Sequence, residues 1–220
     1  MKIPNEIFGR KIDGALERVL SKQKVEPREK PKQRNISAPD LKGFIYVPSI
    51  GLYVSKKRTL QDRNWDQCHK KLSKQGYRMP IILEFIKLLK YAKDNAQDIY
   101  EDITAVRYPL RAEWLDAYFE QRNNGLYVLT ENKTKAERLD NDTLIEDRYD
   151  PGISLEDWLD NPTKQGLPRK DVKSGSLHYW HPINSRVARF GADSVGTLLV
   201  CDLDPDGPYS WLWVHPAKKI

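Results

Sequence analysis

The residues best suited to chemistry form an aromatic run near the C-terminal end. Residues 210–215 read SWLWVH, and Tyr209 precedes them. In a β-strand the two aliphatic residues of this run share one face, while Trp211 and Trp213 share the other face with His215. With the aliphatic face in the core, the exposed aromatics offer a ligand a large contact area at low entropic cost. Alternatively, both indoles pack beneath a neighbouring loop as ordinary core.

An acidic stretch close to this run resembles a cation-binding loop. Residues 202–207 (DLDPDG) match the start of an EF-hand calcium loop, D-x-D-x-D-G. The twelfth position of such a loop requires a bidentate Glu, and here it is Trp213. Pro205 also constrains the backbone. We therefore expect a solvated acidic turn, and no metal site.

The histidines and cysteines suggest no catalytic group. Cys68 and His69 are adjacent on a predicted helix and point about 100° apart, which is poor geometry for a nucleophile and its base. His178 and His181 flank two aromatic residues and have no carboxylate at obvious ligand spacing. We expect the histidines to be surface or structural groups, and we expect Glu84 to be a carboxylate on a helix face or cap.

The elements that must position these residues can be predicted from sequence patterns. Residues 43–48 and 51–55 are rich in β-branched and aromatic residues and surround a Pro-Ser-Ile-Gly turn, which predicts a hairpin. A helix is predicted to begin after Asn64, because a glutamine three residues on completes a capping box. A second helix is predicted over residues 80–93, where the density of apolar residues places it in the core.

The rest of the chain predicts a helix over residues 111–121 and a strand over residues 126–130. Residues 132–150 are a polar excursion with few core residues. Ser154 is a capping residue for a short helix, which Asn161-Pro162 ends. Four more strands are then predicted, over residues 177–180, 186–190, 198–201 and 210–215.

Two segments of the chain carry a family resemblance. Residues 64–85 (NWDQCHKKLSKQGYRMPIILEF) contain a helix with Trp at its start, followed by a Gly-x-Arg-x-Pro motif, and residues 186–191 read RVARFG. These segments resemble the C-type lectin fold in the form found in formylglycine-generating-enzyme-like proteins. The resemblance covers roughly residues 43–93 and 177–215. It implies an α+β fold with two helices packed on a small, mostly antiparallel sheet whose last strands come from the chain's end.

The departures from this family bear on its enzymatic activity. Oxygenase members bind copper through a cysteine pair, whereas this chain has only Cys68 on the first helix and Cys201 near the end. The Glu-Pro-Asn or Gln-Pro-Asp and Trp-Asn-Asp motifs of calcium-dependent lectins are absent too. The expected protein is therefore not an enzyme and has no cofactor.

Within this superfamily the chain resembles a variable protein of a diversity-generating retroelement, viral or prokaryotic. The resemblance implies a C-terminal surface, within residues 186–215, that is diversified by adenine-directed mutagenesis and binds a protein or cell-surface ligand, as in viral receptor recognition. Two alternatives stay open. One is a formylglycine-generating-enzyme-like oxidoreductase, and the other is a structural viral tail protein without a diversified site.

The diversification mechanism separates two groups of surface residues. An AAY codon mutated at both adenines reaches NNY codons, which exclude Trp, so Trp211 and Trp213 would be fixed. The expected ligand-binding surface comprises Gly191, Asp193, Val195, Gly196, Thr197, Leu199, Leu203, Tyr209, Trp211 and Trp213.

The formal net charge of +6 lies mostly in an N-terminal arm. Residues 1–34 hold ten Lys and Arg against five Asp and Glu, whereas residues 190–217 hold four Asp and neither Lys nor Arg. An acidic surface repels phosphate, so we expect no nucleic acid at the C-terminal surface. Residues 5–22 predict an amphipathic helix, and residues 23–39 predict a Pro-containing linker. This arm is either a solvated extension or a docking helix for oligomer or particle contacts.

We therefore expect two parts in the chain. Residues 1–39 form a basic helix and linker, and residues 40–220 form the C-type lectin-like domain, with a polar insertion around residues 94–176. Two cysteines exclude a disulfide-rich scaffold. No signal-peptide pattern is visible, and no stretch approaches the roughly 18 apolar residues of a membrane span, which predicts a cytoplasmic or virion-associated protein.

Overall fold

The computed structural model describes residues 6–7, 10–11 and 41–219. The chain divides into two compact units, residues 1–40 and 41–220. In the first unit β1 (Glu6–Ile7) pairs antiparallel with β2 (Arg10–Lys11). The prediction of an amphipathic helix over residues 5–22 is therefore wrong at residues 6–7 and 10–11, which form strands. The rest of that helix, and the predicted linker, lie outside the described residues.

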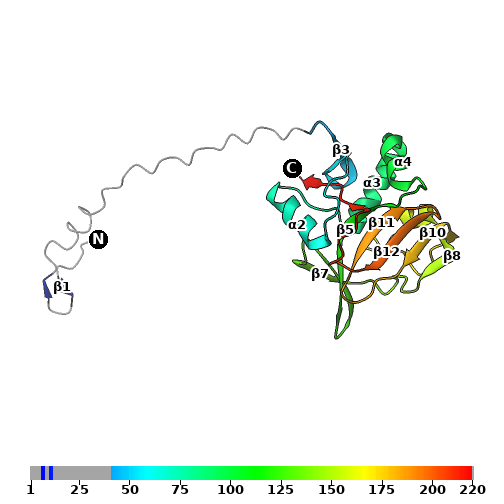
Figure 1. Cartoon of the computed structure of the whole chain (residues 1–220). Helices are drawn as coiled ribbons and strands as arrows, with labels where there is room; N and C mark the ends of the chain where they lie inside the picture. Colours follow the sequence, from blue (N-terminus) through cyan, green and yellow to red (C-terminus); the bar gives the residue numbers. More distant parts are fainter. Residues whose placement is uncertain (1–5, 8–9, 12–40, 220) are drawn as a thin grey trace. The chain divides into compact units, whose positions relative to one another are not determined.

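The second unit opens with the predicted hairpin. β3 (Phe44–Val47) and β4 (Leu52–Ser55) pair antiparallel across a 3-10 turn, Pro48–Ile50. β14 (Ala217–Lys219) pairs antiparallel with the other edge of β4. A small sheet in the order β14-β4-β3 thus joins the first and last described strands of this unit (Figure 1).

Two helices follow the hairpin, as predicted. α2 (Trp65–Lys74) begins with a complete capping box, in which the side chains of Asn64 and Gln67 each accept the other residue's backbone N–H. α3 (Ile82–Asn95) begins where Glu84 accepts a backbone N–H of the residue before the helix. The predicted capping role of Glu84 is confirmed.

The segment predicted as a helix over residues 111–121 is instead the strand β5 (Arg111–Arg122). Residues 112–117 are all buried. A strand buried on both faces loses the apolar and polar alternation that identifies a half-exposed strand. β5 pairs with β6 (Gly125–Thr130), the strand predicted at residues 126–130, and with β11 (Arg186–Ala192).

The main sheet has the order β7-β6-β5-β11-β12-β10-β8-β9, with β13 pairing to β5 outside this path (Figure 1). Within that order the pairs are antiparallel except for β10 with β12. The predicted strands near residues 177, 186 and 198 are confirmed, whereas the one predicted over residues 210–215 shrinks to two residues. The further strands are β7 (Lys135–Arg138), β8 (Arg148–Ile153), β9 (Ser174–Gly175), β10 (Leu177–Trp180), β12 (Thr197–Leu203) and β13 (Leu212–Trp213).

One face of the sheet, the inner face, carries the larger hydrophobic core. Phe85 of α3 and Trp158 of α5 (Leu155–Asp160) both pack on Phe190 of β11, with ring centroids 5.2 and 6.0 Å apart. α5 begins at its predicted cap, because the Ser154 hydroxyl accepts a backbone N–H inside the helix. The described fold is therefore α+β, with helices packed on a mainly antiparallel sheet.

The opposite face, the outer face, is covered in part. α2 packs Trp65, Cys68 and Leu72 into a second core that includes Trp114 of β5 and Val187 of β11. That core includes no residue of β10. The outer face of the sheet around β10 and β12 is therefore not covered by α2 (Figure 1).

The region predicted as a polar insertion, residues 94–176, contributes to the inner core. Ile99 and Ile103 lie on α4 (Gln97–Thr104), and Leu139 and Leu144 lie beyond β7; all four belong to the inner cluster. Each of the four has at least one polar neighbour in sequence, so the segment as a whole has a polar composition and its core residues were not recognised. The segment is thus part of the packed domain.

Candidate ligand-binding surface

A row of side chains crosses the outer face of the sheet. Trp114 on β5 is paired with Arg189 on β11, Arg189 with Val200 on β12, and Val200 with Trp180 on β10. Residues in register on neighbouring strands point to the same side, so these four form one continuous row. Trp114 is fully buried, whereas Trp180 is half-buried. The row therefore runs from the outer core towards solvent.

The segment before β13 lies across this row. The rings of Tyr209 and Trp114 are 5.9 Å apart, and those of Tyr209 and Trp211 are 5.0 Å apart. The Trp211 ring lies 4.7 Å from the guanidinium carbon of Arg189, a cation–π contact. Both aromatic residues are half-buried. The structure thus brings together two of the aromatic residues predicted from sequence, over a cation that was not predicted.

Arg189 has unusual surroundings for a guanidinium group. Its side chain is 8% exposed, and Nε and Nη1 have no hydrogen-bond partner among the described residues. Burial lowers the pKa of Arg189 to about 10, while Asp193 and Asp202 oppose that effect. The group therefore stays charged at neutral pH, and its two unpaired donors lie buried beside the Trp211 ring.

An acidic edge borders the row next to Trp180, whose ring lies 4.9 Å from that of Tyr149. Asp147 accepts hydrogen bonds from the Tyr149 hydroxyl at 2.5 Å and from the backbone N–H of His181 at 2.9 Å. Burial would raise the pKa of Asp147, but these hydrogen bonds outweigh it and hold the pKa below its usual value. Burial and the charge of Asp147 raise the pKa of Asp202. The surface thus combines aromatic, cationic and acidic groups.

Four residues of the predicted surface are buried in the structure. Leu199 and Thr197 are 0% and 9% exposed, and both glycines are buried. A Cβ at Gly191 would lie 2.6 Å from Cβ of Ala112 on β5, and Gly196 has φ of 151°, which side chains rarely adopt. The expected surface is therefore corrected at these positions. Leu199 packs in the inner core, and Gly191 allows β11 to approach β5. Gly196 provides the turn conformation, and Thr197 is buried at the start of β12.

The other predicted positions retain some exposure. Val195 is 65% exposed in the turn between β11 and β12, and Leu203 is half-buried beside the outer core. The Asp193 carboxylate accepts the backbone N–H groups of Val195 and Gly196 at 2.8 and 3.3 Å, so it stabilises its own turn. Leu203 therefore packs against the same outer core as Tyr209 and Trp211. Asp193 and Val195 instead lie in the turn.

Trp213 lies in a different environment from Trp211. The predicted alternation is confirmed, since Leu212 and Val214 are buried and both tryptophans are half-buried. Trp213 lines a cleft together with Lys56, Lys57 and Arg58. The expectation that His215 faces outward is wrong, because its side chain is 1% exposed.

A buried charge network explains the position of His215. Its Nδ1 lies 2.5 Å from Oε2 of Glu113, and Oε1 of Glu113 accepts a hydrogen bond from Arg58 Nε at 3.1 Å. Burial would raise the pKa of Glu113, but His215 and Arg58 outweigh it and hold the pKa below its ordinary value. Both oxygens of the ionised carboxylate are thus occupied, and the network joins β5 to the hairpin side of the domain.

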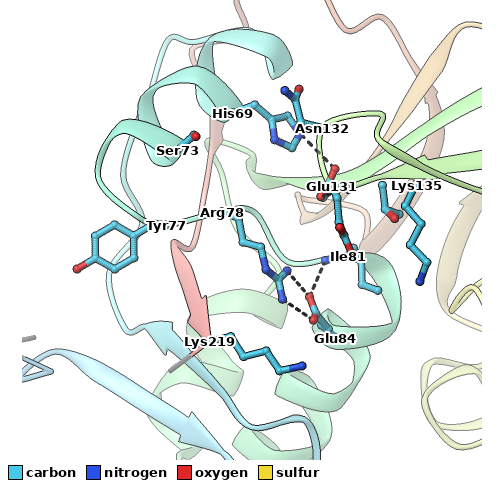
Figure 2. Close-up of a pocket in the computed structure, with 12 residues that line it drawn as sticks. His69, Ser73, Tyr77, Arg78, Ile81, Glu84, Glu131, Asn132, Lys135 and Lys219 are labelled. Carbon is cyan, nitrogen blue, oxygen red and sulfur yellow. Dashed lines mark hydrogen bonds and ion pairs between the residues drawn. The ribbon is translucent and has the colours of Figure 1, made fainter. Parts of the chain in front are cut away.

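A polar pocket of about 480 Å³ lies between α2, α3 and the strands β5 to β7 (Figure 2). His69 Nε2 is 3.2 Å from Oδ1 of Asp116, and both side chains are buried. Asp116 Oδ2 accepts the backbone N–H of Glu131 at 2.8 Å. Ser73 also lines this pocket, but no hydrogen bond joins it to His69 in the described part of the chain. The histidine and aspartate therefore hold α2 against the sheet and lack an aligned nucleophile.

The acidic turn after β12 has its own internal contacts. Asp204 Oδ1 accepts the backbone N–H of Asp206 at 3.0 Å, and Asp204 lies 3.6 Å from Arg186 Nη1. Residues 41–219 and the short described strands before them hold no group of three or more His, Cys, Asp or Glu arranged around a metal ion. The Asp204 carboxylate thus stabilises the backbone of its own turn.

With this geometry in place, the chain can be compared with known proteins. No protein-family model, curated protein or solved structure matches it. Among the described residues, no helix combines the length and apolar character needed to cross a bilayer.

Sequence patterns missed several residues of these sites. Trp180 could have been found from the strand predicted over residues 177–180. Neighbouring side chains of a strand point to opposite faces, so Trp180 faces outward when Tyr179 faces the core. Arg189 gives no such signal, since its contacts come from Val200 on another strand and from Trp211 further along the chain. Glu113 was hidden because its segment was predicted as a helix.

Proposed function

We propose that this protein is a non-enzymatic ligand-binding protein that displays recognition residues on a C-type lectin-like scaffold, as the variable protein of a diversity-generating retroelement. The observation that carries the proposal is the contact of Tyr209 with Trp211, whose ring lies over the buried, still cationic Arg189. Trp, Tyr and Arg are the residue types that are enriched in binding hot spots. The proposed ligand is a protein or cell-surface molecule.

The scaffold part of the proposal is supported by the order of the elements. A hairpin opens the domain, two capped helices follow, and the last strand, β14, returns to pair with β4. The first helix begins at Trp65, whose indole donates a hydrogen bond to the carbonyl oxygen of Leu115 at 2.8 Å. This Trp thereby fixes α2 to the central strand, which gives a physical reason for the motif that resembles the family.

The structure narrows the positions at which diversification is compatible with folding. Val195 and Leu203 have exposed or half-exposed side chains. Asp193 is half-exposed, and other side chains fit there at the cost of the turn hydrogen bonds. Gly191 and Leu199 are scaffold positions. A side chain at Gly191 disturbs the contact between β11 and β5, and a change at Leu199 disturbs the inner core.

A comparison of gene copies tests the proposal directly. We expect a near-copy of the 3′ end of the coding sequence beside a reverse-transcriptase gene, differing almost only at adenines. We expect variants among isolates at Val195 and Leu203, and none at Leu199, Trp211 or Trp213. If no such repeat exists, or if residues 191–213 are invariant among isolates, the diversified-surface proposal fails and the structural-protein alternative gains.

Thiol labelling tests the oxidoreductase alternative. Burial raises the pKa of Cys68 to about 12 and that of Cys201 well above its usual value. The two thiols also belong to different cores, on opposite faces of the sheet. We expect an aromatic disulfide reagent to react at least about 100-fold more slowly with the native protein than with the urea-unfolded protein, because thiolate is the reactive species. Rapid labelling of both thiols in the native protein would support the alternative.

A further inference from the structure

A cleft beside Trp213 has a charge opposite to that expected from the neighbouring sequence. Its volume is about 370 Å³, and it is lined by Lys56, Lys57, Arg58, Asp102, Arg111 and Trp213. We call these six residues the cationic cleft. The acidic residues of the segment 190–217 do not line it, and its cations come from the end of β4 and the start of β5.

The carboxylates at the cationic cleft are already shared among several arginines. Asp102 lies 2.9 Å from Arg58, 3.3 Å from Arg107 and 3.1 Å from Arg111. Glu113 is bound on one oxygen by Arg58 and faces His215 with the other. These acids therefore have little capacity to neutralise further cations.

The two lysines add charge that has no counter-ion in the structure. Lys56 and Lys57 are exposed, and neither ammonium group has an ion-pair partner in residues 41–219 or in the described strands before them. Five cationic side chains, with Arg107 included, thus face two carboxylates, which leaves a surplus of three positive charges. Such a surplus in a concave site favours an anionic ligand.

The chemistry of the walls narrows the class of anion. The Arg111 side chain is 47% exposed, and a guanidinium fork can bind two oxygens of one oxyanion while the ammonium groups supply further donors. Trp213 adds an aromatic wall, which packs against the face of a ring. The volume is in the range of small-molecule sites, of about 300–1,000 Å³.

We propose that the cationic cleft binds a phosphate or sulfate ester carried on a ring. Lys56, Lys57 and Arg111 hold the oxyanion, Trp213 packs on the ring, and the buried Arg58 fixes Asp102 behind them. This site shares Trp213 with the expected ligand-binding surface, but its cations lie outside the segment 186–215 and Trp213 is not an expected diversified position. Absence of binding here would leave the gene-copy test unaffected.

Calorimetric titration of the full chain at low salt tests the proposal. The probes are adenosine monophosphate, N-acetylglucosamine sulfate, inorganic phosphate and unmodified adenosine. We expect at least one ester to bind more tightly than inorganic phosphate, adenosine not to bind, and affinity to fall as salt is raised. The stronger of the two esters identifies the preferred ligand class, a nucleotide or a sulfated sugar. Absence of binding by both esters, or equal binding of adenosine, overturns the proposal.

A pair of matched double variants locates the site. We expect the combined Lys56→Ala and Lys57→Ala variant to bind the ester at least about tenfold more weakly, a loss of about 1.4 kcal/mol. The control combines Lys70→Ala and Lys71→Ala, which removes two adjacent exposed lysines of α2 outside the cleft and changes the net charge equally. The control should bind like the unmodified protein. Equal weakening of both variants would show general charge attraction and overturn the proposal.

The role of the ring wall has a separate measurement. We expect Trp213→Leu to weaken ester binding about tenfold and to leave inorganic phosphate binding unchanged. Trp213→Phe keeps an aromatic wall and should recover most of the affinity, which a general folding defect would not allow. Unchanged ester affinity in Trp213→Leu would remove the ring from the proposal.

Discussion

Replacing Glu113 with Gln is expected to lower the free energy of unfolding by about 3 kcal/mol. The Glu113 carboxylate accepts from Arg58 on one oxygen and faces the His215 ring on the other, and its side chain is 2% exposed. A Gln amide has one acceptor oxygen, so its NH₂ group must face one of these donors. The variant therefore leaves a buried donor unpaired and removes one of the two carboxylates that pair with Arg58. Urea unfolding followed by tryptophan fluorescence measures the loss.

Glu120→Gln is the matched control, since Glu120 lies on the same strand and pairs with Arg122 at about 41% exposure. Solvent screens that pair, so the expected change is below about 0.5 kcal/mol. A loss in Glu113→Gln no larger than in this control would contradict the network's structural role.

The same variant has an expected dependence on pH. The pKa of Glu113 is below its ordinary value of 4.5 in the folded chain, so unfolding raises it and the unfolded state binds the proton more readily. The carboxylate therefore stabilises the fold fully above the ordinary pKa, and this contribution is lost as pH falls through the lower folded pKa. The difference between the unmodified protein and Glu113→Gln should shrink in urea titrations performed below about pH 4.5. A constant difference would mean that ionised Glu113 contributes nothing.

Leu199→Ala is expected to destabilise the protein by about 3 kcal/mol, because it removes buried methyl groups and leaves a cavity. Leu199 is fully buried in the inner core of β12. Val195→Ala, four residues away, is the control, since Val195 is 65% exposed. Its expected effect is within about 0.5 kcal/mol. Thermal and urea unfolding of both variants give the comparison.

This pair of variants decides whether Leu199 belongs to the scaffold or to a surface. Under the proposed diversification, mutated AAY codons reach the residues at both positions, so the codon argument alone does not separate them. A small effect at Leu199, similar to that at Val195, would contradict its core position and return it to the expected ligand-binding surface. A large effect would confine that surface to side chains outside the core.

Elements with local signals could be predicted from the sequence. The capping box at Asn64 and the cap at Ser154 depend on side chains within one helical turn, and both helices begin where they were expected. The alternation around Trp211 likewise assigned its neighbours to the correct faces. In each of these cases the interactions that determine the local structure lie within a few residues of one another in the sequence.

Features that depend on distant segments could not be predicted. β5 is buried on both faces, so the alternation that marks a strand is absent from it. The charge beside Trp213 comes from Lys56 and Lys57, which lie far away in sequence, and summing the charge of residues 190–217 gave the opposite sign. The alternation placed His215 on the outward face with Trp211 and Trp213. Its buried partner, Glu113, lies on the strand that was predicted as a helix.

The pairing of β14 and β3 with opposite edges of β4 has a mechanical consequence. Phe44 of β3 lies opposite Ser55 at one end of β4, and Lys219 of β14 lies opposite Leu52 at the other end. Tension applied between residues 41 and 219 therefore pulls along the strands in opposite directions. The inter-strand hydrogen bonds then bear the load together in shear, and the domain resists being pulled open from its two ends.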